Sequence, residues 1–275
     1  MPHAAPEATV ALVRVPVAPV HADPRVSSAQ TTQATFGHVL VLRERHGDWY
    51  DAQTTPDGYR GWIHAGYLIE VDDPAPAVAQ AASDRAAAAA AAQGLRVSLG
   101  CTARAGGRTL RLPLGAWIGP DVDLLEGDAL PMDEMPARFP RDGEAVARSA
   151  ARYFGSTSYQ WGGLTPWGAD CSGLVQTVFA LHGVELPRDA SQQATVGLDA
   201  GREFALHAPG DLLFFSDRDD GRVTHVGLAA GGGRMMHLAL GRGGFADEDL
   251  AGDDDPYVAA LRRRFVGARR VLGPG

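Results

Sequence analysis

The sequence has 275 residues, 45% hydrophobic and 21% charged, which is typical of an ordinary soluble globular protein with room for two or three modest domains. Its formal net charge of -8 gives no electrostatic support to a nucleic-acid partner, and no apolar run approaches the ~18 residues of a membrane span. Residues 1–24 lack a basic n-region, and Arg14 and repeated Pro interrupt the apolar stretch. We therefore predict no signal peptide and a cytoplasmic location, with the cell envelope or secretion as the alternative.

Short apolar runs separated by turn residues predict a small all-β domain over residues 1–72. The predicted strands lie in VALVRVPV, HVLVLRE, DWYDAQT and RGWIHAGYL, with TTPDGY as a hairpin turn. Residues 73–92 are rich in Ala and Pro and predict a linker. Strand patterns resume in LRVSL, RTLRLPLGAWIG and DVDLLEGDALP, which predicts a second small β domain over residues 93–139.

Helical and strand patterns are mixed over residues 140–275, which predicts an α+β domain. GEAVARSAARYF has helical spacing, and a Gly- and Trp-rich loop leads into the apolar run CSGLVQTVFALHG. DLLFFS, HVGLAAG and RMMHLAL predict strands, and DPYVAALRRRFVGARRVL predicts a short helix and a last strand. The charged runs ADEDLAGDDD and LRRRF are interpreted as solvated surface.

Cys171 is the candidate nucleophile. A loop with Gly162, Gly163 and Gly168 precedes it, and the apolar run begins at it, so we predict a position in the first turn of a helix. The N–H groups and partial positive charge of a helix N-terminus lower the pKa of a thiol and can hold an oxyanion. The alternative is a buried, inert cysteine, which is our interpretation of Cys101. With only these two cysteines, we predict free thiols in a reducing compartment.

His225 and His237 are candidates for the base and for the group that orients it. They lie in consecutive predicted strands joined by a GGG hairpin, an arrangement that would place the two imidazoles side by side. The orienting residue cannot be Asn, because the sequence contains none. The alternative is that each histidine is an ordinary half-buried strand residue.

The spacing of Cys and His does not match a metal site. Neither C-x-x-C nor H-E-x-x-H occurs, so we do not expect a zinc site. The chain also has no Lys, which excludes a phosphate-binding loop that needs one. We expect neither a metal nor an organic cofactor.

Four blocks within residues 140–275 carry a family resemblance: YQWGGLTPWGADCSGLVQ, LPRDASQQ, APGDLLFFS and THVGLAAGGGRMMH. In this order they resemble the NlpC-type bacterial cell-wall cysteine peptidases, which are relatives of papain. The block DGYRGWIHAGYL resembles the end of the SH3-like accessory domains of that family. The resemblance implies an α+β, papain-like catalytic domain preceded by two small all-β SH3-like barrels.

The resemblance also implies roles for single residues. Cys171 matches the nucleophile, His225 the general base and His237 the third, orienting residue. Asp170 and Ser172, on either side of the nucleophile, match substrate-binding positions. In the best-matching subfamily, Asp170 would bind the free amine of an N-terminal L-Ala.

Three positions outside the D-C-S-G block complete the implied site. Tyr59 matches a tyrosine that reaches over the catalytic cleft, and Ser191 of PRDASQQ is a candidate substrate contact. The subfamily tends to carry a Glu near SSAQTTQ, where this sequence has Ala29. The amine site would then depend on Asp170 alone.

The resemblance implies a thiol endopeptidase that cleaves the amide bond between γ-D-glutamate and a diamino acid in murein peptides. The expected substrates are recycled peptides such as L-Ala-γ-D-Glu-diamino acid with a free N-terminal L-Ala. The alternatives are an exported hydrolase of intact murein, a papain-like amidase or acyltransferase, and a non-catalytic binding module. The complete set of Cys171, His225 and His237 argues against the last of these.

Overall fold

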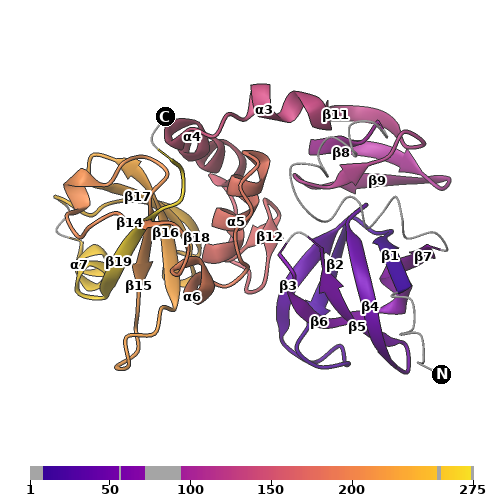
Figure 1. The fold of residues 1–275 in the computed structure, drawn as a ribbon, viewed down its shortest axis with the longest axis horizontal. Coiled ribbons are helices and arrows are strands. Elements are labelled where there is room, and N and C mark those ends of the chain that lie inside the picture. The colour runs from indigo at the N-terminus through magenta and orange to yellow at the C-terminus, as the bar shows by residue number, and fades with distance from the viewer. Residues whose placement is uncertain (1–8, 56, 72–93, 253–254, 274–275) are drawn as a thin grey trace, which may run out of the picture. The chain divides into compact units, whose positions relative to one another are not determined.

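The computed structural model describes residues 9–55, 57–71, 94–252 and 255–273 (Figure 1). The chain divides into two compact units, Met1–Glu134 and Met135–Gly275. The predicted linker over residues 73–92 lies outside the described residues. Within the described ranges, no helix is both long and apolar enough to cross a membrane.

The N-terminal unit begins with a seven-stranded antiparallel sheet in the order β3-β2-β6-β5-β4-β1-β7. All four predicted runs form strands; β1 covers the first half of VALVRVPV, and the last residue of that run, Val17, begins β2. The strand β3 has mostly polar side chains and therefore no apolar signal in the sequence. The bounds are β1 Thr9–Val13, β2 Val17–His21, β3 Gln30–Thr35, β4 Val39–His46, β5 Trp49–Thr54, β6 Arg60–His64 and β7 Leu68–Val71.

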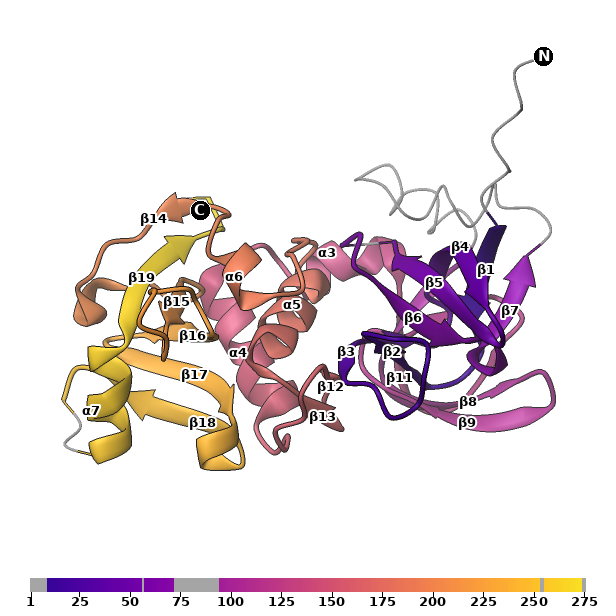
Figure 2. The ribbon, with the colours of Figure 1, turned by 90° about the horizontal axis from the view of Figure 1, so that it is seen from below.

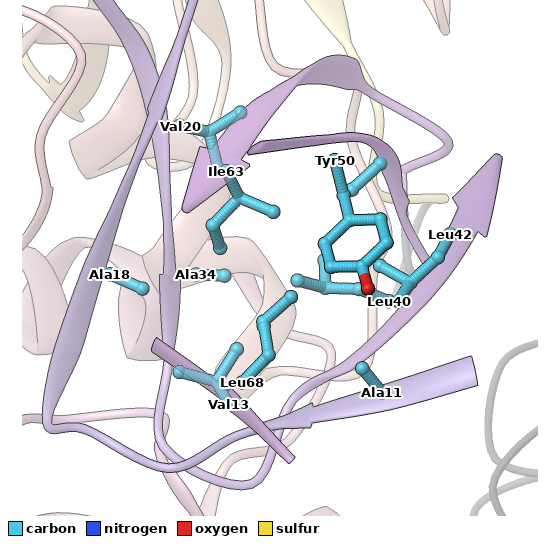
Figure 3. Close-up of a cluster of buried hydrophobic side chains, with 11 residues drawn as sticks. Ala11, Val13, Ala18, Val20, Ala34, Leu40, Leu42, Tyr50, Ile63 and Leu68 are labelled. Carbon is cyan, nitrogen blue, oxygen red and sulfur yellow. The ribbon is translucent and has the colours of Figure 1, made fainter. Parts of the chain in front are cut away.

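Every strand of this sheet contributes to one buried apolar core (Figure 3). Residues two apart in a strand share a face, so pairs such as Leu40 and Leu42 point to the same side. Burial of each large aliphatic side chain stabilises the fold by ~1.5–3 kcal/mol. The core consists of Ala11, Val13, Ala18, Val20, Ala34, Leu40, Leu42, Tyr50, Ala52, Ile63 and Leu68.

A second sheet in the same unit has the order β10-β8-β11, with β9 also paired to β8. Its strands are β8 Arg96–Ala105, β9 Arg108–Leu112, β10 Trp117–Ile118 and β11 Asp123–Pro131. The Trp117 N–H donates to the carbonyl oxygen of Phe36 at 2.9 Å, and the ring of His38 lies 5.0 Å from that of Trp117. These contacts join the two sheets within one compact unit.

The strand pairing of both sheets is open, whereas the sequence analysis expects closed barrels. Closure of the first sheet requires its two edge strands, β3 and β7, to pair with each other. Within the described residues, β3 pairs with β2 and β7 pairs with β1. The region is therefore all-β, as predicted, but its hydrogen bonds do not form a closed ring of strands.

The C-terminal unit contains a six-stranded sheet in the order β14-β19-β15-β16-β17-β18, and every pair in it is antiparallel. The predicted strands DLLFFS, HVGLAAG and RMMHLAL are confirmed as β15, β16 and β17. The acidic segment after them forms a strand that the sequence analysis does not predict. The bounds are β14 Leu198–Asp199, β15 Leu212–Phe215, β16 His225–Gly231, β17 Arg234–Ala239, β18 Gly244–Asp249 and β19 Phe265–Arg270.

Helices cover both faces of this sheet (Figure 2). On one face, α4 (Gly143–Phe154) and α5 (Cys171–Leu181) pack against β16 and β17, and on the other α7 (Pro256–Arg263) packs against a cluster that includes Leu213 and Phe215. The β15 run LLFF is buried throughout because its two faces meet different helices. The segment GEAVARSAARYF is confirmed as α4, which begins at the capping carboxylate of Asp142.

Candidate active site

Cys171 is the first residue of α5, so the predicted helix start is confirmed. Asp170 caps this helix with an extended backbone, and its Oδ1 accepts from the N–H of Gly173 at 2.7 Å. A Cβ at position 173 would lie 2.1 Å from the carbonyl oxygen of Gly163. The D-C-S-G block is therefore a capped helix start, and Gly173 lets the backbone of the preceding loop at Gly163 pack close to the helix.

The carboxylate of Asp170 accepts hydrogen bonds on both oxygens. Its Oδ1 also accepts from Ser172 Oγ at 3.2 Å and from Arg188 Nη1 at 3.0 Å. Its Oδ2 accepts from the N–H of Gly162 at 2.8 Å and from Arg188 Nη2 at 2.7 Å. Arg188 thus forms a bidentate ion pair with Asp170, and the two side chains are only 1% and 7% exposed.

Arg188 binds both residues that flank Cys171, although no role for it was predicted from the sequence. Besides Asp170, its guanidinium donates to Ser172 Oγ at 2.9 Å and to the carbonyl oxygen of Gly163 at 3.4 Å. The side-chain amide of Gln193 donates to the carbonyl oxygen of Ser172 at 3.1 Å. The available signal was the basic residue Arg188 in LPRDA, next to Asp189, because an Arg that becomes buried needs an anionic partner.

His225 and His237 lie side by side, as their predicted strands imply. His225 opens β16, His237 lies in β17, and His225 Nε2 is 2.7 Å from His237 Nδ1. His225 is half-buried and packs against Phe215, with 5.9 Å between ring centroids. His237 is buried and has the ring of Tyr257 at 6.2 Å. The base and orienting roles themselves stay predictions.

The surroundings of Cys171 oppose the thiolate that the sequence analysis expects from a helix N-terminus. Burial and the nearby charge of Asp170 raise the pKa of Cys171 to about 12. Hydrogen bonds from the backbone N–H groups of Val226 and Ser172 and the charge of Arg188 act in the opposite direction but are outweighed. The expected low pKa of Cys171 is therefore wrong for this structure, because desolvation exceeds the effect of the helix start.

The surroundings of His225 favour its neutral form in the same way. Desolvation lowers its pKa to about 3, and the neighbouring imidazole of His237 adds to this, against a smaller opposing effect of Asp217. A neutral imidazole can accept a proton, whereas an imidazolium cannot. Cys171 and His225 therefore both favour their neutral forms, a thiol and an imidazole that can accept a proton.

Tyr159 is a further residue beside the nucleophile that the sequence analysis does not single out. Its phenol is half-buried, and burial raises its pKa, with smaller contributions from a Cys171 thiolate, when one forms, and from the charge of Asp170. The tyrosine therefore stays protonated and can donate a hydrogen bond at this site. Its place at the start of the YQWGG block was the available signal.

Glu248 of β18 is buried behind His237, so the interpretation of its acidic run as solvated surface is wrong at this position. It is 5% exposed, and its Oε1 lies 3.5 Å from His237 Nε2. Arg242 donates to both of its oxygens, at 2.7 and 3.1 Å. Side chains alternate along a strand, which turns Glu248 inward while Asp247 stays exposed.

The remaining candidates lie in separate places. Ser191 is half-buried in the short helix α6 (Ala190–Gln193). Tyr59 and Ala29 belong to the N-terminal unit, Tyr59 half-buried between β5 and β6 and Ala29 exposed just before β3. Their roles stay predictions. Cys101 is a buried free thiol, 3.3 Å from Ser98 Oγ, in agreement with a structural role.

Arg188→Met should strongly destabilise the protein, because it leaves Asp170 charged, buried and without its cation. Breaking one side of a buried ion pair costs ~3–5 kcal/mol, and we expect the free energy of unfolding in urea to fall by about that amount. Asp170→Asn in the same chain should recover part of the loss. The matched control is Arg148→Met, whose exposed pair with Glu144 contributes only ~0–1 kcal/mol. Equal effects of the two Met variants would contradict this account.

The reaction of Cys171 with iodoacetamide should accelerate with pH without reaching a plateau by pH 10. The thiolate is the reactive species, and with a pKa raised to about 12 its fraction still rises tenfold per pH unit in that range. Mass spectrometry of the modified peptide measures the rate between pH 6 and 10. Cys171→Ala reports any background reaction at Cys101. A plateau at or below pH 8 would show that the thiolate forms near neutrality after all.

Comparison with known proteins places this geometry in a family. Residues 156–253 match the NlpC/P60 family, and residues 16–69 match the bacterial SH3 domain. Two relatives named gamma-D-glutamyl-L-lysine dipeptidyl-peptidase are each 27% identical to this chain. The match to the Bacillus subtilis relative spans 75% of this chain and 71% of the relative, and the match to the Bacillus cereus relative spans 88% and 75%.

A solved structure of an NlpC/P60 family protein from Bacillus cereus has a similar fold. Its TM-score is 0.72 at 18% sequence identity, over 96% of this chain and 100% of that chain. Cys171, His225 and His237 all fall within the segment that matches the family. The chain therefore carries a domain of the NlpC/P60 family of cell-wall cysteine peptidases and, ahead of it in the sequence, a bacterial SH3 domain.

Proposed function

We propose that this protein is a cysteine endopeptidase that hydrolyses the amide bond between γ-D-glutamate and a diamino acid in murein peptides. The observation that carries the proposal is the 2.7 Å contact between His225 and His237, in the same family domain as a cysteine at the start of a helix. A nucleophile, a base and an orienting group are the parts that acyl transfer needs. The names of the two Bacillus relatives support the choice of bond.

The resting charge state supports a reaction in which the thiol proton moves as the bond forms. His225 takes the proton of Cys171 while the sulfur attacks the substrate carbonyl, which gives a thioether-linked tetrahedral oxyanion and an imidazolium. Backbone N–H groups at the start of α5 stabilise the oxyanion. The imidazolium then protonates the leaving amine, and the C–N bond breaks to leave a thioester.

Hydrolysis of the thioester repeats these steps with water in place of the thiol. His225 removes a proton from water, hydroxide adds to the carbonyl, and the Cys171 thiolate leaves and is protonated by the imidazolium. His237 holds the ring of His225 through both half-reactions. We propose that the arrangement is papain-like, because Cys171 lies at the start of α5 and this helix packs against the sheet that carries His225.

Substrate selection is proposed to begin at Asp170, which would attract the free amine of an N-terminal L-Ala. Its charge is shared with Arg188, so the amine would bind to an ion pair and not to an isolated carboxylate. The attraction is therefore closer to that of one charged hydrogen bond, ~1.5–3 kcal/mol, than to that of a full buried ion pair. Ser172, Ser191 and Tyr59 are proposed as further substrate contacts.

A free-amine requirement would direct the enzyme to released peptides. In intact murein the L-Ala amine is tied up in an amide to the glycan, so it carries no charge for Asp170 to attract. We accordingly propose a role in the recycling of cell-wall peptides in the cytoplasm. Release of peptides from purified sacculi would point instead to a hydrolase of intact murein.

Cys171→Ala and His225→Ala should both abolish cleavage of L-Ala-γ-D-Glu-diaminopimelate, followed by mass spectrometry. Losing a nucleophile or its base costs about 10⁴-fold or more in kcat, because no other group takes over the proton or the acyl group. His237→Gln should lose only ~10–100-fold, since an amide oxygen can still accept from the ring of His225. Circular dichroism checks that each variant is folded. Near-native turnover by Cys171→Ala would end the cysteine-peptidase assignment.

N-acetylation of the same substrate should lower kcat/KM by about 10- to 100-fold, the equivalent of one charged hydrogen bond at Asp170. The comparison uses the free and acetylated peptides with the unmodified enzyme. Asp170→Asn would lose the helix cap as well, so the substrate and not the protein is changed. Similar kcat/KM values for the two peptides would refute amine recognition while leaving the cleaved bond untouched.

A further inference from the structure

The contact between His225 and His237 does not by itself decide where the protons lie. Each neutral imidazole carries one N–H and one bare nitrogen, so the bond from His225 Nε2 to His237 Nδ1 can run in either direction. If His237 donates, the remaining proton of His225 lies on Nδ1, and the ring has no lone pair left for a proton from the thiol. If His225 donates from Nε2, its Nδ1 is bare and can act as the base.

The second nitrogen of His237 meets a group that can only accept. His237 Nε2 lies 3.5 Å from Glu248 Oε1, and an ionised carboxylate has no proton to donate. In a neutral ring, this contact favours the tautomer of His237 with its proton on Nε2. Its Nδ1 is then bare and accepts from His225 Nε2–H, which leaves Nδ1 of His225 free.

Glu248 is held in its ionised form by the residues around it. The hydrogen bond with His237 and then the two hydrogen bonds from Arg242 lower the pKa of Glu248 to about 2, against the effect of burial. Arg242 is itself anchored, because it donates to Asp255 Oδ2 at 2.6 Å and stacks on Tyr257 at 4.3 Å from the ring centroid. A carboxylate that stays charged throughout the working pH range is a constant acceptor for His237.

We propose that Glu248 is a positioning residue that acts through His237 to select the tautomer in which His225 can serve as the base. This inference rests on the proposed function, because it takes His225 as the base. His225 donates from Nε2 to His237 Nδ1, and His237 donates from Nε2 to Glu248 Oε1. Arg242 keeps the carboxylate in place and makes no contact with the reacting atoms in this role.

The tautomers can be read by NMR in a protein that does not turn over. In Cys171→Ala with ¹⁵N-labelled histidine, two-bond ¹⁵N–¹H correlations distinguish a protonated ring nitrogen from a bare one. The spectra of His225→Gln and His237→Gln in this background assign the two rings among the nine histidines. At pH 7 we expect both rings to carry the proton on Nε2. A proton on Nδ1 of His237 would overturn the proposal whatever the enzyme cleaves.

Glu248→Leu in the Cys171→Ala background tests whether the carboxylate of Glu248 causes the proton of His237 to lie on Nε2. We expect the preference for Nε2–H on His237 to be lost, with a mixed or reversed pattern at both rings. Glu248→Gln should keep the pattern, because its amide oxygen can occupy the Oε1 position and accept from His237 and Arg242 together. An unchanged pattern in the Leu variant would overturn the proposal. Backbone amide spectra establish whether each variant is folded. If the Leu variant does not fold, the tautomers in the Gln variant are compared with those in the Cys171→Ala parent, and a changed pattern there would also overturn the proposal.

The kinetic consequence is measured in the enzyme with Cys171 intact. Glu248→Leu should lower kcat by ~10–100-fold, the range for outer hydrogen-bond partners of functional histidines, with KM within about twofold. Glu248→Gln should lose less, because it retains the acceptor. The matched control is Glu144→Gln, which removes a carboxylate from an exposed pair with Arg148 and should leave both constants unchanged. A loss confined to KM, or equal loss in the Leu and control variants, would exclude a positioning role.

Discussion

The candidate site in the C-terminal unit depends on one buried ion pair, between Asp170 and Arg188. Two charges so far from water are tolerated only when they are paired and their remaining polar atoms are hydrogen-bonded. Here the partners are the N–H groups of Gly162 and Gly173 and the hydroxyl of Ser172. One interaction therefore holds the loop before the nucleophile, the cap of its helix and the residue after it. The position of the sulfur follows from that arrangement.

A second carboxylate bound to an arginine lies behind the histidines, and the two carboxylates do different work. Asp170 holds backbone, because it caps α5 and anchors the glycine loop. Glu248 is proposed to fix the place of a proton on His237, because its ionised carboxylate accepts from His237 Nε2. The direction of the hydrogen bonds between His225, His237 and Glu248 matters because Cys171 and His225 begin neutral. The pKa of Cys171 is raised to about 12, and that of His225 is lowered to about 3. An ion pair that forms only during the reaction needs a bare nitrogen that is already in place.

The parts of the fold that could be predicted are those with a strong local pattern. The helix α4 shows its periodicity in GEAVARSAARYF, and β15 to β17 show apolar runs bounded by turn residues. The strands β3 and β18 could not be predicted in this way, because QTTQAT is mostly polar and GFADED has three acidic residues among its six. Their extended form comes from pairing with β2 and β17. Whether a sheet closes into a barrel depends in the same way on its edge strands, which no single run of residues describes.

The sequence by itself determined the helix start at Cys171 and the side-by-side histidine pair, because glycine spacing and strand alternation are local properties. Only the tertiary structure decided that Arg188 is buried on Asp170 and that Glu248 is buried behind His237. It also reversed the expected acidity of Cys171, because desolvation outweighed the field of the helix. The physical reason is common to all three. Burial and the pairing of charges are sums over side chains from distant segments, so the same Glu is solvated in an isolated acidic run and desolvated once β18 pairs with β17.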